Sequence, residues 1–262
     1  MPLDSAVPMT YVLIGDPKEL HYFADTFQWE DNKHFPLAGY QAHLGNLGSA
    51  TRSLAPSINP AIGFNTGWSQ YDPYYIQQES FRYYNQDVPV SRIKYSQASQ
   101  EDTYLTLDFG RSFAKGLNLS VAYRRINQVG EYLHQRQKDT GFSVGLWHDA
   151  PSGKYDAFYN YLNNATVSQE NGGVSDPDSI GRPNWPDLSI PVYLSNDVDD
   201  PSAVATYKQR SFLTRQILHL LTDTTGFGMD VWVQGKFSTG LYKYVDEDII
   251  ESAAAYYGPT YL

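Results

Sequence analysis

One stretch of the chain decides the fold class: Leu117-Asn118-Leu119-Ser120-Val121-Ala122-Tyr123-Arg124. Apolar or aromatic residues occupy every second position, and small or polar residues fill most of the positions between them. Successive side chains of a β-strand point to opposite faces, so this pattern gives the strand one apolar and one polar face. The stretch therefore predicts an amphipathic β-strand.

The same alternation recurs at Leu105–Gly110, Phe142–Trp147, Tyr155–Tyr161 and Asp230–Phe237. Less regular patterns predict further strands at Ala61–Ser69, Tyr74–Tyr84, Val90–Ser96 and Ala205–Leu220. The last prediction leaves an alternative open, because Ser211–Leu221 also has the composition of a helix. The chain is expected to be all-β almost throughout.

The composition excludes several classes of protein. The 262 residues include no cysteine and 22 tyrosines, and 29 Asp and Glu against 19 Lys and Arg give a net charge of −10. No stretch approaches the ~18–20 consecutive apolar residues of a transmembrane helix, and the aromatic content argues against disorder. The negative charge argues against a nucleic-acid partner. The lack of cysteine excludes disulfides and thiolate metal sites.

Short and long connections alternate between the predicted strands. Ala114–Gly116 and Asp149–Lys154 are short turns, whereas Gln128–Asp139 and the segment from Leu162 to about Ala203 are long polar loops. Amphipathic strands joined by alternating short turns and long loops are typical of an antiparallel transmembrane β-barrel. In such a barrel the two long loops are expected to face the cell exterior.

The aromatic residues leave a second fold open. In a membrane barrel Tyr and Trp gather at strand ends, at the level of the lipid headgroups. Candidates for such a girdle are Trp68, Tyr71, Tyr74, Tyr75, Phe113, Trp147 and Tyr155. Soluble β-sandwiches that bind glycans also display Tyr and Trp, and Trp185 is a candidate for stacking on a sugar. A glycan-binding sandwich and a secreted β-rich glycoside hydrolase with paired carboxylates therefore remain alternatives.

Three short motifs are similar to a hydrolase motif, a di-iron motif and a calcium-binding motif, but each lacks a feature that its chemistry requires. Gly141–Gly145 fits the G-x-S-x-G pattern of hydrolases, but that motif needs a strand-to-helix turn at the serine, and here the strand alternation continues. Glu131 and His134 have the spacing of a di-iron half-site, which needs a second such motif on a facing helix. The acidic run at Asp197–Asp200 lacks the glycine and distal Glu of an EF-hand. We therefore assign no catalytic, cofactor-binding or metal-binding residue.

Four stretches of the chain resemble the outer-membrane porins of Bacteroidota-type bacteria. They are Leu44–Ala50 (LGNLGSA) with Asp25-Thr26 before it and Gly63-Phe64 after it; Phe81–Tyr84 with Val88–Val90 and Ile93–Tyr95; Leu117–Tyr132; and Tyr159-Asn160 with Glu170–Val174 (ENGGV). Their order and spacing match the family over about residues 20 to 260.

The resemblance implies a partial transmembrane β-barrel in the bacterial outer membrane. Residues 1–262 would be one barrel domain and the N-terminal portion of a longer chain, with residues 1–60 as an N-terminal extension and first strand. The start lacks a signal peptide, which is expected to lie upstream or to have been removed. The implied partners are outer-membrane lipid and small solutes that pass through passively, without enzymatic chemistry or a cofactor.

Charged residues on the polar face of the predicted strands are the candidates for lumen-facing positions. They are Arg92, Lys94, Asp108, Arg124, Asp156, Asp230 and Lys236. Charge in a barrel lumen tunes ion selectivity. Because the signs are mixed, they predict no preference for anions or cations.

Overall fold

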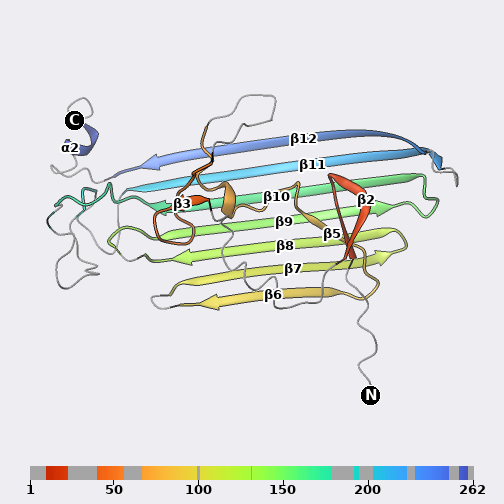
Figure 1. The fold of residues 1–262 in the computed structure, drawn as a ribbon, viewed down its shortest axis with the longest axis horizontal. Coiled ribbons are helices and arrows are strands. Elements are labelled where there is room, and N and C mark those ends of the chain that lie inside the picture. The colour runs from red at the N-terminus through yellow and green to blue at the C-terminus, as the bar shows by residue number, and fades with distance from the viewer. Residues whose placement is uncertain are drawn as a thin grey trace, which may run out of the picture.

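A long antiparallel sheet dominates the computed structural model of the protein (Figure 1). The structure describes residues 10–22, 40–55, 67–98, 101–130, 132–176, 178, 192–194, 203–222, 228–247 and 254–258. The sheet has seven strands in the order β12-β11-β10-β9-β8-β7-β6. Their bounds are β6 Val90–Gln97, β7 Thr103–Ala114, β8 Leu117–Gln128, β9 Gln137–Asp149, β10 Tyr155–Gln169, β11 Val204–Thr222 and β12 Gly228–Val245.

The all-β prediction is confirmed, and the regular alternations lie inside β7, β8, β9, β10 and β12. The weaker pattern at Val90–Ser96 is also a strand, β6. The helical alternative for Ser211–Leu221 is wrong, because this segment lies within β11 and pairs with strands on both sides. Two neighbouring strands satisfy its backbone groups, so the extended form prevails over local composition.

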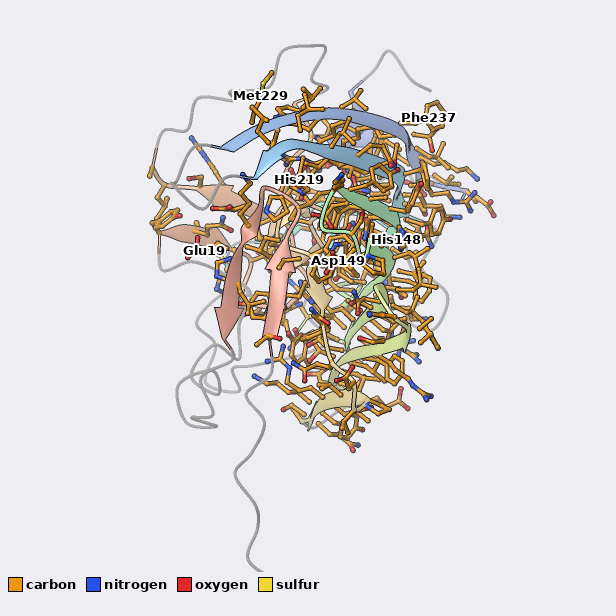
Figure 2. All side chains as sticks on the ribbon, turned by 90° about the vertical axis from the view of Figure 1, so that its right-hand side faces the viewer. Glu19, His148, Asp149, His219, Met229 and Phe237 are labelled. Carbon is orange, nitrogen blue, oxygen red and sulfur yellow. The ribbon has the colours of Figure 1, made fainter. Side chains whose placement is uncertain are left out.

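A second, smaller group of elements lies against one face of the sheet, and the sheet curves around it (Figure 2). We call this group the insert, and it comprises the described residues 10–22, 40–55 and 67–89. It contains the sheet β2-β1-β5 and the hairpin β3-β4. Its elements are β1 Thr10–Leu13, β2 Asp16–Tyr22, β3 Gln41–His43, β4 Thr51–Ser53, the 3₁₀ helix η1 Asp72–Tyr74 and β5 Arg82–Tyr84.

The strand predicted at Tyr74–Tyr84 is wrong except at its end, where Arg82–Tyr84 forms the strand β5. This segment holds the end of η1, an irregular stretch and the short strand β5. Pro73 lies in η1, and the irregular stretch bonds to side chains of the large sheet rather than to a neighbouring strand. Residues 61–66 of the strand predicted at Ala61–Ser69 lie outside the described part of the chain, and residues 67–69 are not extended into a strand.

Strand register divides the side chains of the large sheet between two faces. Residues directly opposite each other on paired strands point to the same face of the sheet. The faces of β10 therefore determine those of β9 and β11, and the register assigns the remaining strands in the same way. We call the face that contacts the insert the inner face and the opposite one the outer face. β6 and β12 each pair with one strand only among the described residues, so the sheet is open at both edges.

The helical elements of the described chain are short. They are η1 and α2, which runs from Ala254 to Tyr257. No helix among the described residues is long and apolar enough to cross a membrane.

Candidate functional site

Small and polar side chains line the inner face of the central strands. Those that are buried beneath the insert include Asn118, Ser120, Ser143, Asn160, Asn164, Thr166 and Ser211. On β10 the even-numbered residues from Phe158 to Ser168 are all buried. A polar face can be buried without penalty only if its groups find hydrogen-bond partners. The insert supplies many of those partners.

Gln78 of the insert connects two strands of the sheet. Its amide nitrogen donates to Asn160 Oδ1 at 3.0 Å, and its amide oxygen accepts a hydrogen bond from Ser211 Oγ at 2.8 Å. Asn160 in turn donates to Ser143 Oγ at 2.9 Å. Gln78 is only 2% exposed. This buried chain of hydrogen bonds fixes the position of the insert across β9, β10 and β11.

Backbone groups of the insert also bond to the inner face. Asn164 accepts a hydrogen bond from Ile76 N at 3.2 Å and donates one to Ile76 O at 3.1 Å. Ser120 Oγ accepts from Tyr84 N at 2.8 Å. Arg124 donates to Tyr74 O at 2.8 Å. Asn164 and Arg124 thus satisfy an irregular backbone that has no strand partner of its own there, and Ser120 bonds to the backbone of strand β5.

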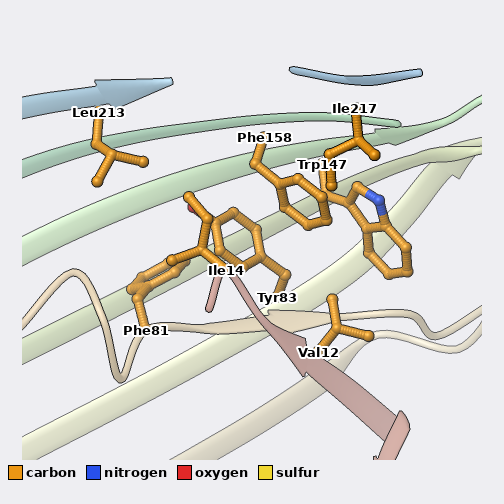
Figure 3. Close-up of a cluster of buried hydrophobic side chains, with 8 residues drawn as sticks. All are labelled: Val12, Ile14, Phe81, Tyr83, Trp147, Phe158, Leu213 and Ile217. Atoms are coloured by element: carbon orange, nitrogen blue, oxygen red, sulfur yellow. The ribbon is translucent and has the colours of Figure 1, made fainter. Parts of the chain in front are cut away.

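A hydrophobic cluster joins the insert to one half of the inner face (Figure 3). The insert contributes Val12, Ile14, Phe81 and Tyr83, and the sheet contributes Trp147, Phe158, Leu213 and Ile217. The rings of Trp147 and Phe158 stack with centroids 5.6 Å apart, and Tyr83 meets Phe158 edge-on at 5.1 Å. Aromatic packing of this kind excludes water, so this part of the inner face is filled rather than open.

Two inner-face glycines make room for the insert. A Cβ atom on Gly145 would lie 2.3 Å from Phe81, and one on Gly110 would lie 2.5 Å from Tyr84. No real Cβ contact is that short, so any side chain at these positions would displace the aromatic ring. The inner face is therefore shaped to fit the insert as well as to bond to it.

Of the aromatic residues that the sequence predicts for a girdle, some are buried and others are exposed. Trp147, Tyr71 and Tyr74 are buried on the inner side, so the girdle prediction is wrong for them. Tyr71 and Tyr74 pack with Ile126 in a second buried cluster. Burial raises the pKa of Tyr74 to about 12, because a phenolate is disfavoured away from water. Phe113, by contrast, is exposed beside the short turn after β7.

The structure places all seven sequence-predicted lumen candidates on the inner face, and several have a partner there. Arg92 makes an ion pair with Asp108 through two nitrogens, at 3.0 and 2.6 Å. Lys236 pairs with Glu79 of the insert at 3.1 Å. Lys94 lies on the same face of β6 as Arg92.

His219 brings together Asp156 and Asp230, which the sequence did not link. Its Nε2 atom lies 3.0 Å from Asp156 and its Nδ1 atom lies 2.8 Å from Asp230. Lys18 of the insert makes an ion pair with the same Asp230. Sequence reasoning missed His219, although its position two residues after Ile217 on β11 could have placed it on this face. The carboxylates are engaged in holding β10, β11, β12 and β2 together.

The hydrolase pattern at Gly141–Gly145 lies in the middle of β9, and no turn follows Ser143. Ser143 Oγ is buried and donates to the carbonyl of Tyr161 at 3.2 Å. Among the described residues no group of three or more His, Cys, Asp or Glu could hold a metal ion. The acidic run at Asp197–Asp200 and Trp185 lie outside the described residues.

The outer face carries an apolar belt, which no other described element covers. Its side chains include Ile93, Leu107, Phe109, Val121, Tyr123, Phe142, Val144, Leu146, Tyr159, Tyr161, Phe212, Leu218, Val231, Val233 and Phe237. Phe237 is 70% exposed and Val233 65% exposed. Soluble monomers rarely expose so large an apolar surface. A β-sandwich would cover this face with a second sheet, so the sandwich alternative does not describe this fold.

The belt runs obliquely across the sheet. Following directly opposed residues from strand to strand leads from Leu107 of β7 to Asn163 of β10 and on to Thr239 of β12. The belt on β12, however, centres on Val233. It therefore shifts by roughly one residue per strand, which is the offset expected when strands are tilted by about 35–45° to the axis of a barrel.

The model of a protein family described as "Putative porin" matches residues 22–237, which is most of the chain. No curated protein and no solved structure matches the sequence or the fold.

Proposed function

Because the chain belongs to this porin family, we propose that it forms part of an outer-membrane β-barrel through which small solutes pass passively. One observation carries the proposal: the seven-stranded sheet has a polar inner face and an oblique apolar belt on its outer face. In a bilayer the belt would contact lipid, and the paired strands would satisfy the backbone. No catalytic step is involved.

The open edges of the sheet suggest how the barrel is completed. Exposed edge strands are templates for further pairing, and seven strands leave β6 and β12 with one free edge each among the described residues. We propose that residues 1–262 are a single barrel domain and that further strands of a longer chain pair with these edges. The inner face would then line the lumen, with Arg92, Lys94, Asp108, Arg124, Asp156, Asp230 and Lys236 as lumen-facing residues.

Thiol labelling of two neighbouring residues on β6 tests the orientation. Residues 1–262 contain no native cysteine, so within them a membrane-impermeant maleimide labels only an introduced one. We expect Lys94→Cys on the inner face to react in intact outer membranes, and Ile93→Cys on the outer face to be protected by lipid. In the isolated chain Ile93 is 64% exposed, so a soluble protein would label strongly at Ile93→Cys and overturn the proposal.

Conductance tests the passage of solutes. The full chain, purified in detergent, is added to a planar lipid bilayer, and stepwise increases in current are expected. Because the insert fills part of the inner face, Gly145→Leu, whose side chain would displace the ring of Phe81, should conduct more per step than the wild type. If neither protein conducts, the barrel is closed and the porin proposal fails, even if the labelling pattern holds.

A further inference from the structure

The outer face of the sheet carries cations but no anions. No Asp or Glu lies on this face in the described strands, although the chain has 29 of them. Five of its cations are Arg125, Lys138, Lys208, Arg210 and Lys243, which we call the basic band. The other outer-face cation, Arg111, lies near the short turn after β7 and packs on the ring of Phe113, 5.8 Å away.

The basic band borders the apolar belt on one side only. On β8 Arg125 follows Tyr123 on the same face, and on β11 Lys208 and Arg210 precede Phe212. Lys138 and Lys243 lie beyond the belt in the same direction. At this end β8 and β10 lead into the longer connections, residues 129–136 and 170–203. In a barrel this is the side of the outer leaflet.

The register brings the band into two groups. Arg125 lies directly opposite Thr140, and Lys138 lies two residues before Thr140 on the same strand. Lys138 is therefore a diagonal neighbour of Arg125, and diagonal neighbours are roughly 7–8 Å apart. On β11 and β12, Lys243 is likewise diagonal to Lys208, since it opposes Thr206. Between the two groups β10 presents Asn163 and Ala165, whose short side chains leave room above the sheet.

The cations of the band are exposed and have no partner in the part of the chain that the structure describes. None of the five forms a hydrogen bond or an ion pair with another described residue, and all five are exposed. The inner-face cations differ: Arg92, Arg124, Arg215 and Lys236 all bond to protein groups. Because water and salt screen such exposed like charges, the five side chains remain available to an anionic partner.

We propose that the basic band binds the phosphorylated headgroups of anionic lipids in the leaflet on the long-loop side. Lys and Arg at the edge of an apolar belt extend their charged ends to the headgroup level. Arg recognises phosphate through paired N–H groups. Each basic residue near an anionic lipid surface changes the association of that lipid by about fivefold. This inference rests on the proposed membrane location.

Spin-labelled lipids test the band directly. The full chain is reconstituted in phosphatidylcholine bilayers with spin-labelled phosphatidic acid or spin-labelled phosphatidylcholine, and the immobilised fraction of each lipid is measured. We expect the wild type to immobilise phosphatidic acid preferentially. The triple variant Arg125→Gln/Lys208→Gln/Arg210→Gln should lose most of this preference, and Arg125→Lys/Arg210→Lys should keep it.

A charge-matched variant at the other end of the sheet is the control. Arg111→Gln/Lys115→Gln/Lys154→Gln removes three cations near the short turns and should leave the preference unchanged. Equal immobilisation of both lipids by the wild type, or an equal loss in the control, overturns the inference. If neither lipid is immobilised at all, the chain is not in the bilayer, and the proposed function fails instead. Should the triple variant not assemble, the single change Lys208→Gln must still lower the preference.

Discussion

Phe158 and Tyr159 are neighbours on β10, yet they meet two different environments. Phe158 is fully buried among the rings of the insert and the inner face, whereas Tyr159 points outward into the apolar belt. The same contrast holds for charge, because inner-face cations such as Arg92 and Arg124 bond to protein groups, whereas those of the basic band bond to none in the described part of the chain. The inner face is therefore packed against other parts of the chain, whereas no described element covers the outer face.

The largest expected effect comes from removing an inner-face ring. Phe158→Ala should lower the free energy of unfolding by about 3–5 kcal/mol, as large-to-small changes in packed cores do. Tyr159→Ala, one residue away on the outer face, should cost less in a bilayer because lipid can fill the space. Urea-induced unfolding of the reconstituted protein measures both. Equal losses would mean that the two faces do not differ in packing.

Charge placed in the belt should have the next largest effect. Val144→Arg puts a cation in the middle of the belt on β9 and should cost about 2–4 kcal/mol in a bilayer. Thr140→Arg lies four residues along the same face, beside the basic band, and should cost about 0–1 kcal/mol. The folded fraction after insertion into vesicles reports the difference. A belt that faced water would tolerate both changes alike.

Removing a hydrogen bond that holds the insert should lower stability by an intermediate amount. Gln78→Ala leaves the buried side chains of Asn160 and Ser211 with one partner fewer, at a cost of about 1–3 kcal/mol. Gln77→Ala is the matched control, because the Gln77 side chain is exposed where it bonds to the carbonyl of Asp72. Protease cleavage within residues 67–89 should accelerate only in the first variant. Unchanged cleavage would show that the insert does not depend on this contact.

The smallest effect is expected at the exposed ion pair between Lys236 and Glu79. Half-exposed pairs of this kind contribute roughly 0.2–1 kcal/mol. A double-mutant cycle with Lys236→Met and Glu79→Gln should give a coupling in that range, which decreases with added salt. A larger coupling that is insensitive to salt would mean that the pair is shielded from water, and that the lumen is drier than we propose.

The strands and their two faces could be predicted from the sequence because apolar and polar residues alternate along each strand, one set for each face of the sheet. On β8 the alternation from Leu117 to Tyr123 reflects that difference directly, and it does not depend on which strand pairs with which. Ser211–Leu221 was ambiguous because apolar residues such as Leu218, Leu220 and Leu221 occur at both parities around the irregularity between His219 and Leu221. Only pairing with β10 and β12 resolves it.

The insert could not be predicted, because its contacts join residues that are far apart in the sequence. Ile76 meets Asn164 across 88 positions, and Gln78 meets Ser211 across 133. No local pattern records such pairs. Aromatic residues are also ambiguous on their own, since a Trp such as Trp147 suits a lipid headgroup region and a buried core equally well. Gly110 and Gly145 mark places where the insert approaches the sheet closely. The sequence does not show which residues approach them, so this role could not be predicted.

The insert also has a consequence for the order of assembly. Arg215 of β11 bonds to the carbonyl of Ile14, which precedes it by 201 positions. Contacts between such distant parts of a chain form slowly, because a long loop must close before they stabilise anything. Residues 10–22 therefore reach this contact only once β11, which lies much later in the chain, has formed. If further strands pair with the sheet edges, as we propose, these residues must lie inside the curve of the sheet before that pairing is complete, because a barrel that closed first would exclude them.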